Sequence, residues 1–484
     1  MMNNLGMIIN NETICAIATR VGGALSVIRV SGAQAIECVD RIFMSASGKK
    51  LRDCGANTLH YGSVHEHGAH AGDEEDARSL SESSGRETID DVVVSLWRAP
   101  HSYTGEDVVE ISCHGSEYIT RVILQNLIGA GCRQAGPGEF TMRAYLNGKM
   151  DLSQAEAVAD LIASTNKATH DMAMSQLKGH FSHELSLLRE KLLKMNSLLE
   201  LELDFSDHED LEFADRSELR DLAEEIKGKV MALIRSFEAG NALKVGVPVV
   251  IVGKTNVGKS TLLNRLLHED KAIVSDVHGT TRDVIEDTTE ISGITFRFID
   301  TAGIRKTDDK VEKIGIERTF QKMDEAKIVI WLVDDCPSEE EILEMREKNR
   351  EKQLLLVFNK SDTHSYNADV LSSGVVGTCP TALFISAKTG DNISELEKAL
   401  VKAADIPEIT ENDIVVTSVR HYEALVRANE ALTRVLNSLA MDLSGDLIAE
   451  DLKTVLDELG EITGGQISSQ ETLNNIFQHF CIGK

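Results

Sequence analysis

A glycine-rich octet in the middle of the chain has the residue types that hold nucleoside phosphates. It reads Gly-Lys-Thr-Asn-Val-Gly-Lys-Ser from Gly253 to Ser260, between the apolar run 247–252 and the helix-forming run 261–267. A strand, a glycine-rich loop and a helix in this order form a P-loop, whose backbone N–H groups surround phosphates at a helix N-terminus. We therefore predict that Lys259 contacts the β- and γ-phosphates and that the Ser260 hydroxyl binds Mg²⁺.

Three later segments each follow a predicted strand and indicate that the nucleotide is GTP. The segment 300–303, Asp-Thr-Ala-Gly, supplies a carboxylate for the Mg²⁺ shell and a glycine N–H for the γ-phosphate. In the segment 359–362, Asn-Lys-Ser-Asp, the last carboxylate can accept two hydrogen bonds from guanine, a donor pair that adenine lacks. The segment 386–388, Ser-Ala-Lys, fits a loop behind the base. Each fragment alone also fits a turn or a helix cap, but the four in order favour a GTP site.

The composition excludes several classes of protein. A net charge of −28 disfavours a chain that grips nucleic acid by itself, because phosphate contacts need Lys and Arg. No run approaches about 18 uninterrupted apolar residues, and the N-terminus lacks a basic region before a long apolar stretch, so we expect neither a membrane span nor a signal peptide. The eight cysteines form no C-x-x-C pair, which favours a reducing, cytoplasmic location over a disulfide or zinc framework.

The hydrophobic pattern predicts a multidomain α+β and α/β protein. Residues 1–149 form a mixed α/β domain with strand-like runs at 14–18, 24–30, 91–97 and 107–112. Residues 150–243 and 408–484 are helical, and residues 244–407 alternate strand and helix as a Ras-like P-loop GTPase domain does. Helical sequence on both sides favours insertion of the GTPase domain into one helical domain; three domains in series is the alternative.

A low-complexity stretch at 65–90 interrupts the first domain. His65, His67 and His70 in it have the ligand type for a metal. We favour a solvated loop insertion, because the stretch is of low complexity.

The catalytic groups differ from the Ras pattern. The position after Asp-Thr-Ala-Gly, where Ras-like proteins have a Gln that orients water, is Ile304, which cannot exchange a proton. Asn256 in the P-loop offers a side-chain carbonyl, and the loop 275–283 offers backbone carbonyls and two threonines. We therefore predict a monovalent cation, K⁺, between the β- and γ-phosphates, at the place that an arginine finger otherwise takes.

Several further peptides give the chain a family resemblance. It resembles the MnmE (TrmE) family of tRNA-modification GTPases, in the TrmE-Era-EngA-YihA-Septin-like superfamily, from residue 10 to its end. The resemblance rests on Ser-Tyr-Thr-Gly-Glu-Asp at 102–107, Gly-Pro-Gly-Glu-Phe at 136–140, Tyr-Leu-Asn-Gly-Lys-Met-Asp-Leu at 145–152, Gly-Thr-Thr-Arg-Asp at 279–283, Val-Glu-Lys-Ile-Gly-Ile-Glu-Arg at 311–318 and Phe-Cys-Ile-Gly-Lys at 480–484. Departures from the family pattern are the 65–90 insertion and His278.

The resemblance implies an activity, cofactors and partners. The N-terminal domain would form a homodimer and bind 5,10-methylene-tetrahydrofolate or a related reduced folate as one-carbon donor. K⁺-dependent GTP hydrolysis would serve addition of a (carboxymethyl)aminomethyl-type group to C5 of the wobble uridine, U34, of tRNA. The flavoprotein MnmG (GidA) would join in a heterotetramer and supply a surface for the tRNA substrate; no membrane is implied.

The resemblance also assigns residues by motif. K⁺ would be held by Asn256, Ser275, Val277 and Thr280, and Mg²⁺ by Ser260 and Thr281. Glu312 would orient water, and Arg29, Glu110, Lys149 and Lys484 would bind folate. The implied GTP-binding residues are Asn256, Val257, Gly258, Lys259, Ser260, Thr261, Ser275, Asp276, Val277, His278, Gly279, Thr280, Thr281, Asp300, Thr301, Ala302, Gly303, Asn359, Lys360, Asp362, Ser386, Ala387 and Lys388.

Two questions stay open at this point. Cys481 can be a catalytic nucleophile facing the one-carbon unit or a small packed residue after Phe480; in either case we expect the tail to dock near the folate site. The alternative function is a regulatory or assembly GTPase without one-carbon chemistry, and binding of reduced folate by the isolated chain separates the two.

Overall fold

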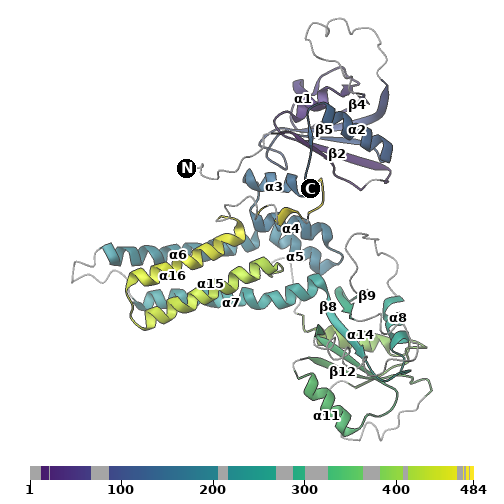
Figure 1. Ribbon diagram of the computed structural model, residues 1–484, viewed down its shortest axis with the longest axis vertical. Helices are drawn as coiled ribbons and strands as arrows, with labels where there is room; N and C mark the ends of the chain where they lie inside the picture. The colour runs from purple at the N-terminus through teal and green to yellow at the C-terminus, as the bar shows by residue number, and fades with distance from the viewer. Residues whose placement is uncertain are drawn as a thin grey trace. The chain divides into compact units, whose positions relative to one another are not determined.

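The structure, a computed structural model, describes a large part of the chain. The described residues are 12–20, 22–66, 87–204, 216–268, 287–299, 325–350, 352–363, 382–406, 413–465, 473, 476–478 and 480–483. They divide into two compact units, one of Met1–Ala159 with Leu459–Lys484 and one of Asp160–Glu458. Figure 1 labels their helices and strands. Among the described residues, no helix has the length and apolar character that crossing a membrane requires.

The first unit is built on a seven-stranded sheet with the strand order β3-β4-β5-β6-β2-β1-β7. Neighbouring strands are antiparallel except for β1 and β7. The strands are β1 (Ile14–Ile17), β2 (Leu25–Ser31), β3 (Phe43–Ser45), β4 (Thr58–His65), β5 (Thr88–Trp97), β6 (Val108–His114) and β7 (Arg133–Gln134).

Two of the described helices cover one face of this sheet. Alternate residues such as Ile28, Val94 and Ile111 are buried in one core with the helices α1 (Ala35–Asp40) and α2 (Glu117–Gly129) (Figure 1). Side chains alternate between the faces of a strand, so the intervening residues lie on the opposite face. Much of that face is open: Leu59 is 71% exposed and Leu25 is 67% exposed.

The C-terminal segment packs with two short helices in the same unit. Helix α3 (Glu139–Leu146) is followed by α4 (Leu152–Ala163). Leu152 and Ala155 share a small core with Leu473 and Phe477. Burial of these apolar side chains, at roughly 25 cal/mol per Å² of surface, holds the end of the chain against residues more than three hundred positions earlier.

The second unit contains a helical part on either side of the α/β part in sequence. The helices are α5 (Lys167–Leu177), α6 (His180–Asp204), α7 (Arg216–Val245), α15 (Val419–Ala440) and α16 (Gly445–Thr463), whose last residues belong to the first unit. Helices α7 and α15 pack together, with the rings of Phe237 and Tyr422 stacked 4.4 Å apart. The α/β part is therefore inserted between two partners of one helical bundle, as predicted.

The α/β part contains a six-stranded sheet with the order β13-β12-β11-β8-β10-β9. All pairs are parallel except the β9–β10 hairpin. The strands are β8 (Val247–Val252), β9 (Asp287–Ile291), β10 (Ile294–Phe298), β11 (Ile328–Val333), β12 (Gln353–Phe358) and β13 (Ala382–Phe384), and the helices are α8 (Lys259–His268), α11 (Glu339–Lys348) and α14 (Ile393–Ala404).

The central strands of this sheet are buried on both faces. In β8, Val249 and Ile251 lie in one core, with residues of α8 and α14, whereas Val250 and Val252 lie in a second core with Ile342 of α11. This is why the sequence of β8 is continuously apolar rather than alternating.

The expected loop at 65–90 is shorter than predicted at both ends. Strand β4 continues to His65 and strand β5 begins at Thr88, so these residues pair in the sheet. The ring of His65 accepts or donates hydrogen bonds with the hydroxyls of Ser63 and Thr88. His67 and His70 lie outside the described residues, and the described part of the chain holds no cluster of metal-ligating side chains.

Candidate functional site

The P-loop begins at the carboxyl end of β8 and leads into α8, as the sequence predicts. Lys259, Ser260 and Thr261 begin α8, so the helix N-terminus faces the loop. The Lys259 ammonium donates to the carbonyls of Gly253 (2.7 Å) and Lys254 (2.8 Å), and burial lowers its pKa. The ammonium therefore lies at the loop itself, where a P-loop lysine meets phosphate oxygens.

Asn359 joins three of the predicted motifs. Its side-chain amide donates to the Val257 carbonyl in the P-loop (2.7 Å), and its carbonyl oxygen accepts from the N–H of Ala387 (2.9 Å). The residue is buried. A Cβ at Gly258 would lie 2.3 Å from the Asn359 side-chain nitrogen, so only glycine fits there. Asn359 thus links the P-loop, the 359–362 segment and the 386–388 segment directly by hydrogen bonds.

The carboxylate predicted to read guanine is oriented by a neighbour. The Ser386 hydroxyl donates to one carboxylate oxygen of Asp362 at 2.8 Å. Lys360 has a left-handed backbone (φ 64°), and its ammonium pairs with Asp334 at 2.6 Å. Arg265 of α8 donates to the Lys388 carbonyl (2.8 Å). These contacts hold the base-side loops at the carboxyl ends of parallel strands, where α/β sheets bind ligands.

Part of the predicted GTP and cation site lies outside the described residues. Asn256 is described; it is exposed and has a left-handed backbone (φ 62°) within the P-loop. The remaining residues stay predictions: Ser275, Asp276, Val277, His278, Gly279, Thr280, Thr281, Asp300, Thr301, Ala302, Gly303 and Glu312.

In the first unit, two predicted folate residues form an ion pair. Arg29 of β2 and Glu110 of β6 are direct cross-strand neighbours, and Arg29 Nε donates to Glu110 Oε1 at 2.7 Å. Their side chains are 17% and 23% exposed, so the pair is accessible from one side. The guanidinium also lies over the rings of Tyr103 (5.4 Å) and Phe140 (5.6 Å), which stabilise the cation through their π faces.

Lys149 makes no described contact with the Arg29–Glu110 pair, but it contacts the loop 100–105, which carries Tyr103. Its ammonium donates to the Pro100 carbonyl at 2.9 Å, and its methylene groups lie against Gly105. Tyr103, which touches Arg29, lies between these two loop residues in the sequence. The fourth predicted residue, Lys484, lies outside the described residues.

The C-terminal tail docks at Arg29, one of the residues predicted to bind folate; that this is a folate site stays a prediction. The Gly138 N–H donates to the Cys481 carbonyl (3.3 Å), Ile482 forms a β-bridge with Pro137, and Arg29 Nη1 donates to the Gly483 carbonyl (3.4 Å). Cys481 is exposed. Its role as a nucleophile is not tested by this geometry.

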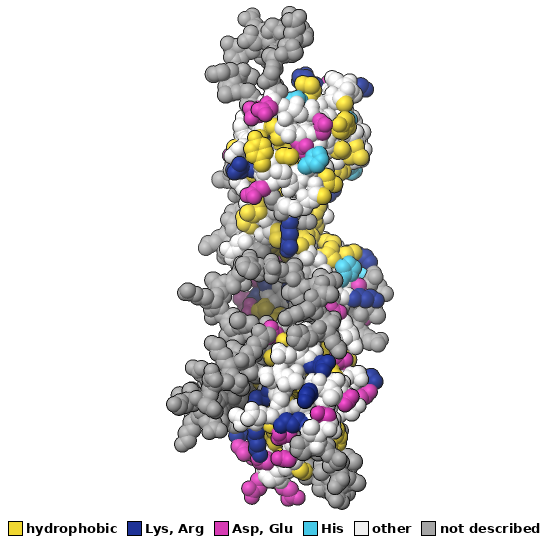
Figure 2. Space-filling model, turned by 90° about the vertical axis from the view of Figure 1, so that its right-hand side faces the viewer, with side chains coloured by type: hydrophobic (Ala, Val, Ile, Leu, Met, Phe, Trp, Pro, Cys, Tyr) yellow, Lys and Arg dark blue, Asp and Glu magenta, His cyan; other side chains and the backbone are white. Residues whose placement is uncertain are grey.

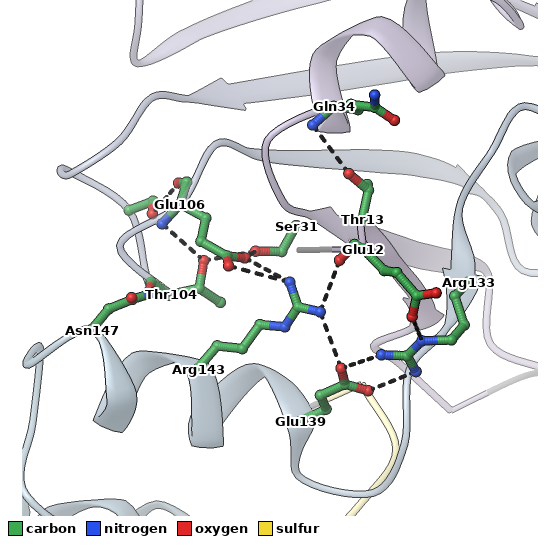
Figure 3. Close-up of polar contacts among 11 residues, drawn as sticks. Glu12, Thr13, Ser31, Gln34, Thr104, Glu106, Arg133, Glu139, Arg143 and Asn147 are labelled. Atoms are coloured by element: carbon green, nitrogen blue, oxygen red, sulfur yellow. Dashed lines mark hydrogen bonds and ion pairs between the residues drawn. The ribbon is translucent and has the colours of Figure 1, made fainter. Parts of the chain in front are cut away.

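Sequence reasoning missed an ionic cluster beside the tail (Figure 3). Arg143 of α3, whose side chain is 5% exposed, donates to Glu106 (3.0 Å), Glu139 (3.1 Å) and the Glu12 carbonyl (2.9 Å). Arg133 donates to Glu139 (2.6 Å) and Glu12 (2.8 Å). The signal was present, because Glu106 and Glu139 belong to the family-specific peptides 102–107 and 136–140.

At Glu139, neighbouring charges and hydrogen bonds affect the pKa of the carboxyl group more than burial does. Burial by itself raises the pKa of this carboxyl group, but hydrogen bonds from Arg133 and the Gly136 N–H, together with the charges of Arg133 and Arg143, lower it overall. The same contact with Glu139 raises the pKa of Arg133. Glu139 is therefore held as a carboxylate between two arginines.

Comparison with known proteins shows the family. A model described as "GTP-binding protein TrmE N-terminus" matches residues 13–149, and one described as "MnmE helical domain" matches residues 152–481. Proteins named "tRNA modification GTPase MnmE" are 54% identical in Phocaeicola vulgatus (98% of this chain, 99% of the relative), 54% in Bacteroides thetaiotaomicron (98% and 100%) and 48% in Flavobacterium johnsoniae (98% and 100%). With this agreement along nearly its whole length, and with its P-loop and base-side motifs assembled, the chain belongs to the MnmE (TrmE) family of tRNA modification GTPases.

Proposed function

We propose that this GTPase is the K⁺-dependent subunit of a complex that modifies C5 of the wobble uridine, U34, in tRNA. It would work with the flavoprotein MnmG (GidA) in a heterotetramer and with 5,10-methylene-tetrahydrofolate or a related reduced folate, adding a (carboxymethyl)aminomethyl-type group. The observation that carries this proposal is the Arg29–Glu110 pair with the Cys481-bearing tail docked on it. A GTPase acting only as a regulator or assembly factor needs no site for a folate.

The donor set at Arg29 fits a reduced folate. Glu110 Oε1 accepts from Arg29, and its second oxygen, which has no described hydrogen bond, can accept from the N–H edge of a pterin. Arg29 and the exposed Lys149 are cations for the carbonyl and carboxylate groups of the ligand. Bound folate would supply the one-carbon unit; the residues of this chain orient it.

The GTP site has the groups that phosphate and guanine need. Lys259 at the start of α8 neutralises phosphate charge, and Asp362, held by Ser386, accepts from guanine. The Ser260 hydroxyl is the donor type that Mg²⁺ takes in P-loops, and the exposed amide of Asn256 is an oxygen donor for K⁺. These ions would neutralise charge that develops on the phosphates, with Glu312 and the residues 275–281 completing the site.

The open face of the first sheet supports the proposed homodimer. Leu25, Met44, Leu59 and Tyr61 are each more than half exposed, and the strand register places them on the same face as Arg29. Hydrophobic side chains are visible at the surface in the upper part of Figure 2. Exposed apolar patches of this kind mark interaction surfaces, and a twofold dimer would pair the patch with itself. The free thiols of all described cysteines accord with a cytoplasmic location.

Binding of reduced folate to the full chain tests the proposal. We expect 5-formyl-tetrahydrofolate, a stable reduced folate, to bind the wild-type chain in calorimetry and to bind the variants Arg29→Ala and Glu110→Gln at least about tenfold more weakly, because each removes a charged contact. Arg121→Ala, on the exposed side of α2, is the matched control and should bind like wild type.

Mass analysis of wobble uridines completes this test. In a strain whose own copy of the gene is deleted, the wild-type chain should restore the modified uridine and the two site variants should not. The proposal fails if the wild-type chain binds no folate and the uridine stays unmodified although the chain is expressed. The function would then be that of a regulatory GTPase.

A further inference from the structure

We propose that Glu139 is a positioning residue: clamped by Arg133 and Arg143, it fixes the loop 136–138 on which the C-terminal tail docks at Arg29. The inference rests on the proposed folate function for its consequence in catalysis. Its structural part, the link from Glu139 to the tail, stands on the contacts of the first unit alone.

The first link runs from Glu139 to the loop. Glu139 Oε2 accepts from the Gly136 N–H at 2.8 Å, so the carboxylate holds the backbone three residues before it. The same carboxylate is gripped by Arg133 at 2.6 Å and by Arg143 at 3.1 Å. Hydrogen bonds to a charged group are about twice as strong as neutral ones, and two arginines leave the carboxylate few alternative orientations.

The second link runs from the loop to the tail. Gly138 donates its N–H to the Cys481 carbonyl, and Pro137 bridges to Ile482. The approach is close: a Cβ on Gly138, which has φ 64°, would lie 2.8 Å from the Cβ of Phe480. A shift of the loop therefore displaces the tail, and with it the Gly483 carbonyl that meets Arg29.

The third link joins Arg143 to the loop 102–107, which also lies against Arg29. Arg143 also grips Glu106, whose Oε2 accepts from the Ser31 hydroxyl at 2.7 Å. Ser31 shares a hydrogen bond with Thr104 (2.7 Å), and both residues are fully buried. Arg143 thus joins Glu106 of the 102–107 loop to Glu139 of helix α3 (Figure 3). The loop presents Tyr103 to Arg29, and the helix presents Phe140.

A cluster of this kind serves orientation more than stability. Burying charges costs desolvation energy that their mutual attraction only partly offsets. Apolar side chains of similar size would therefore stabilise the helix at least equally. Apolar contacts are non-directional, whereas a carboxylate between two guanidinium groups and a backbone N–H has a defined geometry. The cluster is therefore suited to holding the loop 136–138 and the tail in a fixed position relative to the ligand site.

The test uses the full chain with Glu139→Gln, which keeps the shape of the side chain but removes its charge. The matched control is Glu12→Gln: Glu12 also pairs with Arg133, at 2.8 Å, but the Gly136 N–H is bonded to Glu139. Hydrogen exchange is followed at the Gly138 amide and in the tail, against the amides of β2 as an internal reference. We expect exchange at Gly138 to rise roughly tenfold more than exchange in β2 in Glu139→Gln, and the control to match wild type.

A second readout separates positioning from folding. Glu139→Gln should bind 5-formyl-tetrahydrofolate more weakly while its GTP hydrolysis stays at the wild-type rate. If Glu139→Gln does not fold, Glu139→Asp, which keeps the charge but is one methylene shorter, takes its place with the same expectation. Unchanged exchange at Gly138 in a folded variant overturns the inference. If wild type binds no folate, the proposed function fails, but the exchange result still decides the role of Glu139.

Discussion

Arg29 Nη1 donates to the carbonyl of Gly483 at 3.4 Å, across 454 positions of sequence. The second-last residue of the chain is thereby part of the surroundings of the Arg29–Glu110 pair. Chain termini ordinarily fray unless they are tied down. Here the tail is tied by this contact, by the bridge to Pro137 and by the packing of Phe477.

Removal of residues 481–484 should abolish tRNA modification and leave GTP hydrolysis close to normal. The tail belongs to the first unit, where it contacts Arg29 and Gly138, whereas the P-loop belongs to the second unit. Mass analysis of wobble uridines and phosphate release from GTP are the two measurements. Normal modification by the truncated chain would reduce the tail to a packing element.

Turnover of GTP should be faster in KCl than in NaCl at equal ionic strength. Asn256 offers an amide oxygen inside the P-loop, and no Gln follows the 300–303 segment. Asn256→Ala should lose most of the K⁺ stimulation and keep most of its GTP affinity, because Lys259 and the loop backbone still bind phosphate. Equal rates in the two salts would remove the cation from the mechanism.

Glu312→Ala should lower kcat and leave nucleotide affinity nearly unchanged. A group that orients the attacking water acts mainly in the transition state, so its loss appears in the rate rather than in binding. Steady-state kinetics of GTP hydrolysis give the separation. A raised KM with unchanged kcat would assign Glu312 a structural role instead.

Asn359→Ala should both destabilise the second unit and weaken GTP binding. The change leaves the Val257 carbonyl and the Ala387 N–H, two buried groups, without their described partner, at a cost of about 2–4 kcal/mol in unfolding free energy. Urea unfolding and nucleotide titration measure the two effects. Asn349→Ala, which removes a side-chain amide that donates to the Met345 carbonyl at the end of α11, is the control for loss of a buried amide outside the site.

The stability of the first unit should fall in acid partly through Glu139. The pKa of this carboxyl is lowered in the folded state, so its contribution is fully present above its ordinary value of about 4.3 and is lost as pH falls through the lower, folded value. Glu139→Gln should therefore be less stable than wild type at neutral pH, and the difference should shrink in acid. A difference that is independent of pH would show that charge plays no part.

The sequence predicted the described parts of the nucleotide motifs, the P-loop and the 359–362 and 386–388 segments, at the ends of strands because their pattern is local. Each motif is a short peptide at the end of a strand, and the strand at 247–252 was predicted with the bounds that β8 has. Family resemblance named Arg29 and Glu110 as well, but as separate residues. Their direct pairing follows from the register of β2 against β6, which depends on how the two strands align across the whole sheet.

The sequence by itself determined the nucleotide motifs, the family and the order of α/β and helical segments, because these depend on local spacing and periodicity. Only the tertiary structure decided that Asn359 joins three motifs, that Arg143 binds Glu106 of a distant loop and that the tail ends at Arg29. These contacts join residues far apart in the chain, and their directions are set by strand register and helix packing, which no local pattern encodes.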